Sequence, residues 1–95
     1  MNLRLVQFNL GSDSRAAAEA LAKELVPAIR SQPGCQSCSF FADHAAGDYG
    51  LVVLWESQQA ADAASGVISP ILFSGVQQAN GSMTASPRLF EVVEP

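Results

Sequence analysis

The sequence predicts one α+β domain over residues 1–95, with the element order strand, helix, strand, strand, helix, strand. Its length is that of a single domain. Four apolar runs of strand length are separated by turn-forming residues, which is typical of strands. Two stretches between them repeat apolar residues at steps of three and four, which is typical of helices packed on a core.

The first strand is expected over residues 3–10, where apolar residues fall on both faces. Because strand side chains alternate, Leu3 and Leu5 share one face, and the opposite face holds Val6, Phe8 and Leu10. The first helix is expected over residues 15–31. Its apolar stripe consists of Ala17, Leu21, Leu25, Ala28 and Ile29.

Two more strands follow once Pro33-Gly34 has ended the helix. We expect them over residues 36–42 and 49–56, joined by a loop over residues 43–48. The short connection makes them an antiparallel hairpin. Ser57 then offers a natural N-cap for the second helix.

The last third of the chain is expected to be less regular. We predict a helix over residues 58–65, a break at Ser69-Pro70 and a short helix over residues 71–79 that buries Ile71, Leu72 and Val76. A loop over residues 80–87 and a strand over residues 88–94 complete the chain. This order is the ferredoxin-like βαββαβ arrangement, an antiparallel four-stranded sheet with both helices on one face.

The sheet is predicted to need burial on both faces. In the third strand Leu51, Val53 and Trp55 point to one face, while Val52 and Leu54 point to the other. Two helices on one side cover only one of these faces. We therefore expect a homodimer in which an identical chain covers the second face.

Charge and composition limit the classes of molecule that the protein is expected to bind. The formal net charge is −4, and the five basic residues are scattered, so nucleic acid is not an expected partner. The sequence shows no polybasic patch and no membrane-spanning run, and we expect no signal peptide. We expect a cytoplasmic protein with reduced cysteines and no membrane contact.

Several motifs, taken in order, resemble the antibiotic biosynthesis monooxygenase family. Pro33-Gly34-Cys35 follows the first helix, Trp55-Glu56-Ser57 ends the third strand after Tyr49, and Arg88-Leu-Phe-Glu-Val92 closes the chain. The resemblance spans nearly the whole chain. It implies a homodimer whose two sheets form an α+β barrel, with a cavity between sheet and helices in each subunit.

The resemblance also implies a range of activities. Some members oxidise aromatic polyketides, anthrones or hydroquinones with oxygen and use no metal or flavin. A related branch opens haem with a first-strand Asn, a third-strand Trp and a second-helix His. This chain has Asn9 and Trp55, but residues 62–66 contain no His, which argues against haem degradation. We therefore expect no cofactor and no metal.

Three residues are candidate catalytic groups. The Asn9 amide is predicted to hold a substrate carbonyl or oxyanion, with a bond to the turn at Gly11-Ser12 as the alternative. Trp55 is predicted to stack on a planar ring and donate its indole N–H, with simple core packing as the alternative. His44 is a candidate base for a phenol, and a solvated loop histidine beside Asp43 and Asp48 is the more favoured interpretation.

An apolar wall is predicted to frame the ligand, which we expect to be a small hydrophobic aromatic molecule. Tyr49 and Trp55 project to the same face of one strand. The predicted substrate-binding residues are Tyr49, Phe8, Leu51, Val53, Leu72 and Phe73.

Cys35 and Cys38 form a C-x-x-C pair that follows a helix C-terminus. A thioredoxin-type pair needs a helix N-terminus, and zinc needs four ligands, so structural cysteines are the favoured interpretation.

Two functions remain open. The first hypothesis is a cofactor-independent monooxygenase that oxidises an electron-rich aromatic, anthrone or quinol. The second is a non-catalytic dimeric module of the same fold that binds a small ligand. A housekeeping quinol oxidase is a variant of the first.

Overall fold

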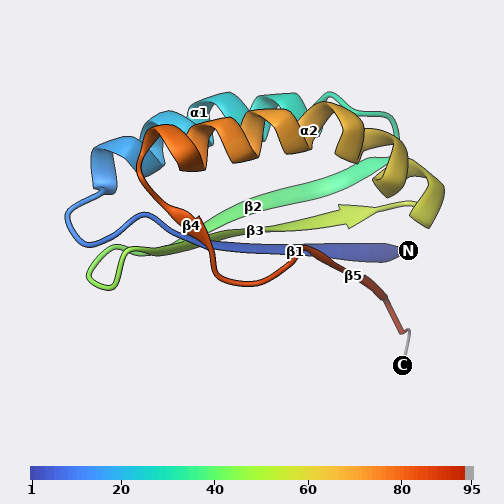
Figure 1. Ribbon diagram of the computed structural model, residues 1–95. Helices are drawn as coiled ribbons and strands as arrows, with labels where there is room; N and C mark the ends of the chain where they lie inside the picture. Colours follow the sequence, from blue (N-terminus) through green and yellow to red (C-terminus); the bar gives the residue numbers. More distant parts are fainter. Residues whose placement is uncertain (94–95) are drawn as a thin grey trace.

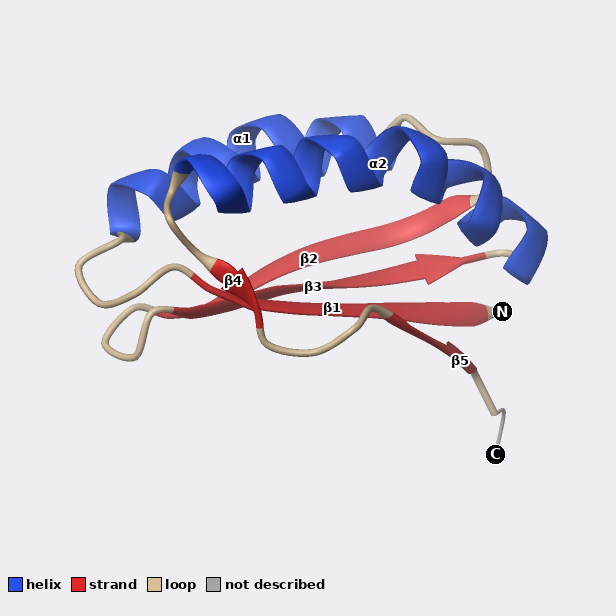
Figure 2. Cartoon of the chain, viewed as in Figure 1, coloured by secondary structure: helices blue, strands red, loops and turns tan. Residues whose placement is uncertain are grey.

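Two helices lie side by side on one face of an antiparallel sheet in the computed structural model, which describes residues 1–93 (Figure 1). Figure 2 shows the same two layers, with the helices in blue over the strands in red. The elements are β1 (Asn2–Asn9), α1 (Arg15–Arg30), β2 (Cys35–Asp43), β3 (Asp48–Trp55), α2 (Gln58–Gln78), β4 (Ser82–Met83) and β5 (Arg88–Glu91). The predicted ferredoxin-like α+β fold is confirmed. Within residues 1–93 no helix is long and apolar enough to cross a bilayer.

The sheet has β1 at its centre. Strand β3 pairs with one edge of β1 and with β2 on its own far side, all antiparallel. The other edge of β1 is covered in two pieces, because β4 pairs with Phe8 and Asn9 while β5 pairs with residues 2–5. Pro87 lies between the pieces, and proline has no N–H to donate to a ladder.

Two predictions about the end of the chain are therefore corrected. Residues 80–87 are not a loop throughout, since they contain strand β4. The last strand ends at Glu91, earlier than expected, while Glu94 lies outside the described residues.

The predicted break at Ser69-Pro70 is wrong, because α2 runs through Pro70 without interruption. The four buried residues of this helix, Ala61, Ala64, Leu72 and Val76, form one stripe on both sides of the proline. Packing of that stripe against the sheet and α1 outweighs the loss of one backbone hydrogen bond at Pro70. At the start of α2 the predicted cap is confirmed, since the Ser57 hydroxyl accepts a bond from the backbone N–H of Ala60 at 3.1 Å.

Helix α1 turns a slightly different stripe toward the core than predicted. Ala18 is buried, whereas Ala17 is exposed and Ala28 is only half-buried. Each residue turns the helix by about 100°, so Ala18 falls within the arc of Leu21, Leu25 and Ile29. Ala17 lies outside that arc.

The two faces of the sheet differ as the alternation predicts. The helix-facing residues Val6, Phe8, Tyr49, Leu51, Val53 and Trp55 are all buried. The rings of Phe8, Phe40 and Tyr49 pack together there, with centroids 6.0 to 6.2 Å apart. The opposite face carries apolar side chains that remain half-buried in the single chain, namely Leu3, Leu5, Val52, Leu54 and Phe90. One face of the sheet thus stays uncovered by this chain.

A tight turn fixes the end of the sheet at which Trp55 lies. Gly34 has a positive φ of 86°, and its carbonyl accepts a bond from the N–H of Glu56 at 2.8 Å. A Cβ on Gly34 would lie 2.6 Å from the Cβ of Ala60, so this turn packs directly against the start of α2. The Trp55 ring is thereby positioned beneath the helices.

Candidate functional site

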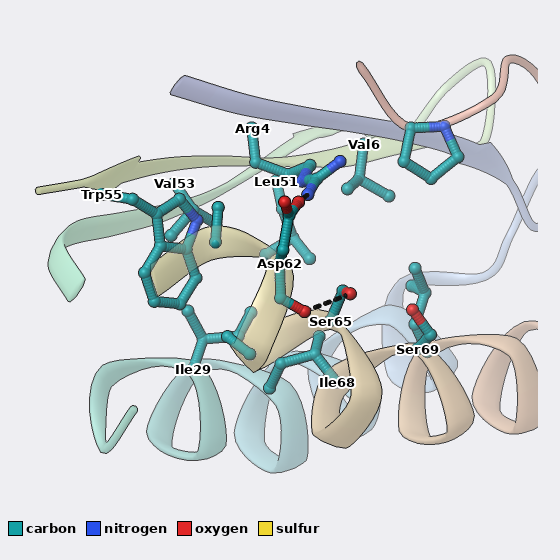
Figure 3. A pocket seen from close by; sticks show the side chains of 14 residues that line it. Arg4, Val6, Ile29, Leu51, Val53, Trp55, Asp62, Ser65, Ile68 and Ser69 are labelled. Atoms are coloured by element: carbon teal, nitrogen blue, oxygen red, sulfur yellow. Dashed lines mark hydrogen bonds and ion pairs between the residues drawn. The ribbon is translucent and has the colours of Figure 1, made fainter. Parts of the chain in front are cut away.

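A cavity of about 330 Å³ lies between the sheet and the helices, next to Trp55 (Figure 3). Side chains from β1, β3, α1, α2 and the segment before β5 form its walls. The lining residues are Arg4, Val6, Ile29, Leu51, Val53, Trp55, Ala61, Asp62, Ala64, Ser65, Ile68, Ser69, Leu72 and Pro87. Its size falls near the lower end of the range for small-molecule pockets.

The inner part of the cavity is apolar and closed to solvent. Ile29, Leu51, Val53 and Leu72 are each at most 3% exposed. Trp55 is 3% exposed as well, and within residues 1–93 its indole nitrogen is a buried donor with no hydrogen-bond partner. In Figure 3 this nitrogen lies on the side of the ring that faces the other lining residues. A buried N–H without an acceptor costs about 1–3 kcal/mol, so this donor is a ready contact for a bound oxygen atom.

The outer part of the cavity is polar. Arg4 leaves β1 toward Asp62 on α2, and a guanidinium nitrogen lies 3.5 Å from a carboxylate oxygen (Figure 3). The Arg4 side chain is 21% exposed and the Asp62 side chain 61%, so this pair marks the mouth of the cavity. One turn along α2, the Ser65 hydroxyl donates to the backbone carbonyl of Asp62 at 2.8 Å.

Four of the predicted site residues line the cavity, namely Trp55, Leu51, Val53 and Leu72. Phe8 and Tyr49 do not line it, since both are buried in the aromatic cluster with Phe40. Phe73 is 46% exposed and lies beside a shallow depression near β4. These three side chains therefore take no part in this cavity.

Asn9 lies at the opposite end of β1, where its side chain joins two loops. Its amide nitrogen donates to the carbonyl of Ala46 at 3.1 Å and to the carboxylate of Asp48 at 2.8 Å. Its amide oxygen accepts the N–H of Gly11 at 2.8 Å, which is the turn contact named above as the alternative. The three side-chain hydrogen bonds of Asn9 all serve this junction, and Asn9 does not line the cavity.

His44 lies near the same junction and contacts a core residue. Its Nδ1 is 2.8 Å from the hydroxyl of Tyr49, and the rings pack edge to face. Tyr49 is only 1% exposed, so His44 supplies the partner that a buried phenol needs. Like Asn9, His44 does not line the cavity. The catalytic roles of both residues stay predictions.

Sequence reasoning missed the polar residues at the mouth. Arg4 is in phase with Val6 and Phe8 on β1, so strict alternation already places it on the buried face. A charged residue in that phase is a usable signal, because buried charges need partners or ligands. Asp62 and Ser65 carry no comparable signal, since their faces depend on the course of α2.

Cys35 and Cys38 are both free thiols on the helix side of β2. A β-bulge between Cys35 and Ser37 brings the two cysteines to the same face, opposite Trp55 and Val53. Burial raises the pKa of both thiols, and Arg30 nearby lowers it by a smaller amount. These thiols are therefore protonated at neutral pH, unlike a reactive thiolate pair.

The cavity does not fit a ligated haem. Haem iron in proteins is held by His, Cys, Met or Tyr side chains, and none of these types occurs among the lining residues. His44 is committed to Tyr49 outside the cavity. The argument against haem degradation, first made from residues 62–66, therefore applies to all residues that line the cavity.

Comparison with known proteins gives a family and a fold. A family model described as antibiotic biosynthesis monooxygenase matches residues 1–66. No curated protein sequence matches the chain.

Several solved structures share the fold. A protein of the same family name from Deinococcus radiodurans is 14% identical with a TM-score of 0.83, over 100% of this chain and 95% of that one. SnoaB, a cofactor-independent oxygenase from Streptomyces nogalater, is 15% identical with a TM-score of 0.76, over 99% and 94%. An arginine-to-serine variant of MhuD, with two manganese protoporphyrin IX molecules bound per active site, is 21% identical with a TM-score of 0.72, over 100% and 97%.

Proposed function

This chain belongs to the antibiotic biosynthesis monooxygenase family, and from that premise we propose that its cavity binds a small, planar, electron-rich aromatic or quinol and oxidises it with O₂. Family membership supports a monooxygenase-type or small-ligand-binding function. The substrate class and the site residues are our proposal. The cofactor-independent oxygenase among the similar structures supports the oxygenase form of it.

The unpartnered indole N–H of Trp55 is the observation that carries the proposal. A folded protein rarely leaves a buried donor unsatisfied. Here the donor lies at an apolar cavity large enough for a small ring system. A phenolic or ketonic oxygen on a bound ring is the acceptor that this N–H lacks. The donor also stabilises that oxygen more strongly when it becomes negative.

The apolar walls suit the rest of the ligand. Leu51 and Val53 from the sheet and Ile68 and Leu72 from α2 offer opposed aliphatic surfaces. A flat ring between them buries both of its faces, which contributes roughly 25 cal/mol per Å² of apolar surface. The same walls keep water away from reactive intermediates.

The proposed chemistry requires the ring system to become an anion. A phenol or an activated ring methylene loses a proton, and the anion then gives one electron to O₂. The resulting radical and superoxide combine into a peroxide anion on carbon, which takes up a proton from solvent to become a hydroperoxide. Loss of water from that peroxide leaves a carbonyl, so that an anthrone methylene and O₂ give a quinone carbonyl and H₂O. Asp62 is the one carboxylate among the lining residues and its side chain is 61% exposed, which supports a role in passing the first proton to solvent.

A binding module without catalysis is the second candidate. The cavity lining holds no histidine, and its only titratable side chains are Arg4 and Asp62. General acid–base catalysis usually employs a group with a pKa near neutrality. This sparse set favours a module that holds a ligand without transforming it.

We further propose that the protein is a homodimer joined through the uncovered sheet face. Leu3, Leu54 and Phe90 lie next to one another across three strands of this face. Replacing Leu54 by Glu is expected to convert the dimer into monomers in light scattering. A cytoplasmic location fits the two free thiols, which persist in reducing compartments.

Oxygen uptake tests the oxygenase. Metal-free protein is mixed with a panel of hydroquinones and anthrones, and uptake is compared with autoxidation. We expect Trp55→Phe to lower turnover about 10- to 100-fold, since it removes a charge-assisted hydrogen bond. Phe73→Leu, an aromatic change outside the cavity, is the matched control and keeps wild-type turnover. Saturable binding without uptake would replace the oxygenase by the binding module.

A further inference from the structure

Arg4 at the cavity mouth has more hydrogen-bonding capacity than the protein uses. A guanidinium carries five N–H donors. Across residues 1–93 the Arg4 side chain makes one ion pair, to Asp62 at 3.5 Å, and no hydrogen bond. Charge-assisted N–H···O bonds are normally 2.7–2.9 Å long, so this pair is loose. The Arg4 side chain is 21% exposed, so its one ion pair leaves most of its N–H donors available to a ligand in the cavity.

Asp62 is a weak partner that a ligand can replace. Its side chain is 61% exposed on α2, and an ion pair with one partner so exposed contributes little stability. A ligand carboxylate that enters the cavity presents two oxygens to the planar guanidinium fork and is able to bind it bidentately. Asp62 then turns to solvent without loss of hydration.

Arg4 and Trp55 lie close together on the helix-facing side of the sheet. Arg4 pairs with Val53 across the β1–β3 ladder, and Trp55 lies two residues further along the same face of β3. Diagonal neighbours of this kind have Cα atoms roughly 7–8 Å apart. Both side chains line the same cavity, and its apolar inner wall lies beside them. A ligand that meets both donors therefore needs an aromatic ring with an acid group on one side and an oxygen on the other.

We propose that the ligand of this cavity is an aromatic acid whose carboxylate displaces Asp62 from Arg4, while its ring oxygen accepts the indole N–H of Trp55. This inference rests on the proposed function for the location of the site, and it adds the acidic substituent. Arg4 is thus the residue that selects acids over neutral aromatics of the same shape.

Anaerobic titration tests the proposal without any turnover. Trp55 is the only tryptophan of the chain, so quenching of its fluorescence reports occupancy of this cavity. The probes are 6-hydroxy-2-naphthoate, which carries its hydroxyl and carboxylate on opposite sides of the ring system, and 2-naphthol, which differs from it only by the missing carboxylate. Wild-type protein is expected to bind the acid at least 10-fold more tightly than the neutral naphthol.

Two variants on opposite sides of the ion pair separate the effects. Arg4→Met is expected to weaken binding of the acid about 10- to 100-fold and to leave naphthol binding unchanged. Asp62→Asn removes the competing carboxylate and is expected to strengthen acid binding about 2- to 5-fold. Because Asp62 is exposed, this second variant folds even where Arg4→Met does not.

Two results would overturn the inference. Equal losses of acid and naphthol binding in Arg4→Met, with no gain in Asp62→Asn, would make the pair a structural link between β1 and α2. Equal affinities of wild-type protein for the two probes would remove the acid requirement and leave the proposed cavity in place. Selective binding of the acid in a protein that consumes no oxygen would support the inference and overturn only the oxygenase.

Discussion

Replacing Ala64 by Leu should fill part of the cavity, raise stability and abolish ligand binding. Ala64 is 2% exposed, lies on α2 and lines the cavity. A leucine there projects three additional carbon atoms into space that the structure leaves unfilled. Function and stability are then expected to move in opposite directions, which a merely damaging substitution does not produce.

The size of the gain follows from the added carbons. Each buried methylene contributes about 0.8 kcal/mol, so three raise the free energy of unfolding by at most about 2.4 kcal/mol. Fixing the leucine rotamer costs about 0.5–1 kcal/mol. The net gain in unfolding free energy is then roughly 1.5 kcal/mol. For a domain of this length, that raises the melting temperature by roughly 6–12 °C.

Urea unfolding and the fluorescence titration measure the two effects in one preparation. Ala63→Leu is the matched control, because Ala63 is the neighbouring residue on α2 and is exposed. It is expected to change neither stability nor affinity by much. A clear loss of stability in Ala64→Leu relative to this control would mean that the space does not exist. Wild-type affinity in Ala64→Leu would mean that the ligand binds elsewhere.

Three further predictions concern residues outside the cavity. Asn9→Ala should lower the free energy of unfolding by about 1–2 kcal/mol, because three hydrogen bonds at the loop junction are lost, and should leave probe affinity unchanged. Lost turnover with normal binding and stability would instead support a catalytic role for Asn9. His44→Ala should lower the free energy of unfolding in urea by about 1–3 kcal/mol, because the buried Tyr49 hydroxyl loses its partner. Adding Tyr49→Phe should recover part of that loss, and additive losses in the double variant would refute this coupling. Burial raises the pKa of the Cys38 thiol above its ordinary value, so the unfolded chain loses this proton at a lower pH than the folded chain. The contribution of Cys38 to the free energy of unfolding should therefore be full below about pH 8.5 and decrease above it. Cys38→Ala should make the decrease measured between pH 7 and pH 10 smaller.

The strands could be predicted because their signal is local. Alternation along β1 and β3 separates Val6 and Phe8 from Leu3 and Leu5 without any knowledge of the fold. The same alternation identified Leu51, Val53 and Trp55 as one wall, and these three line the cavity. Arg4 was predictable by that rule too, but only when the charged residue is counted in the phase of its apolar neighbours.

The rest of the site depends on contacts that local sequence does not contain. Asn9 bonds to Ala46 and Asp48, which are 37 and 39 residues away, so its role at the loop junction follows only from the folded sheet. The cavity residues of α2 share one face only if the helix continues through Pro70. Tertiary packing decides that continuity against the local preference of proline. A prediction that breaks the helix at Pro70 therefore does not place Asp62 and Leu72 on the lining of one cavity.

The cavity and its unused donors are costly in a domain of 95 residues. Such a domain has a total stability of roughly 5–15 kcal/mol. Against that total, the unpaired Trp55 N–H alone costs about 1–3 kcal/mol, and the loosely paired Arg4 adds the desolvation of a charge. In the proposed complex, a ligand whose oxygens meet the two donors offsets both costs. By mass action, a ligand at 100 times its Kd should raise the free energy of unfolding by about 2.7 kcal/mol, which is comparable with the cost of the unpaired N–H.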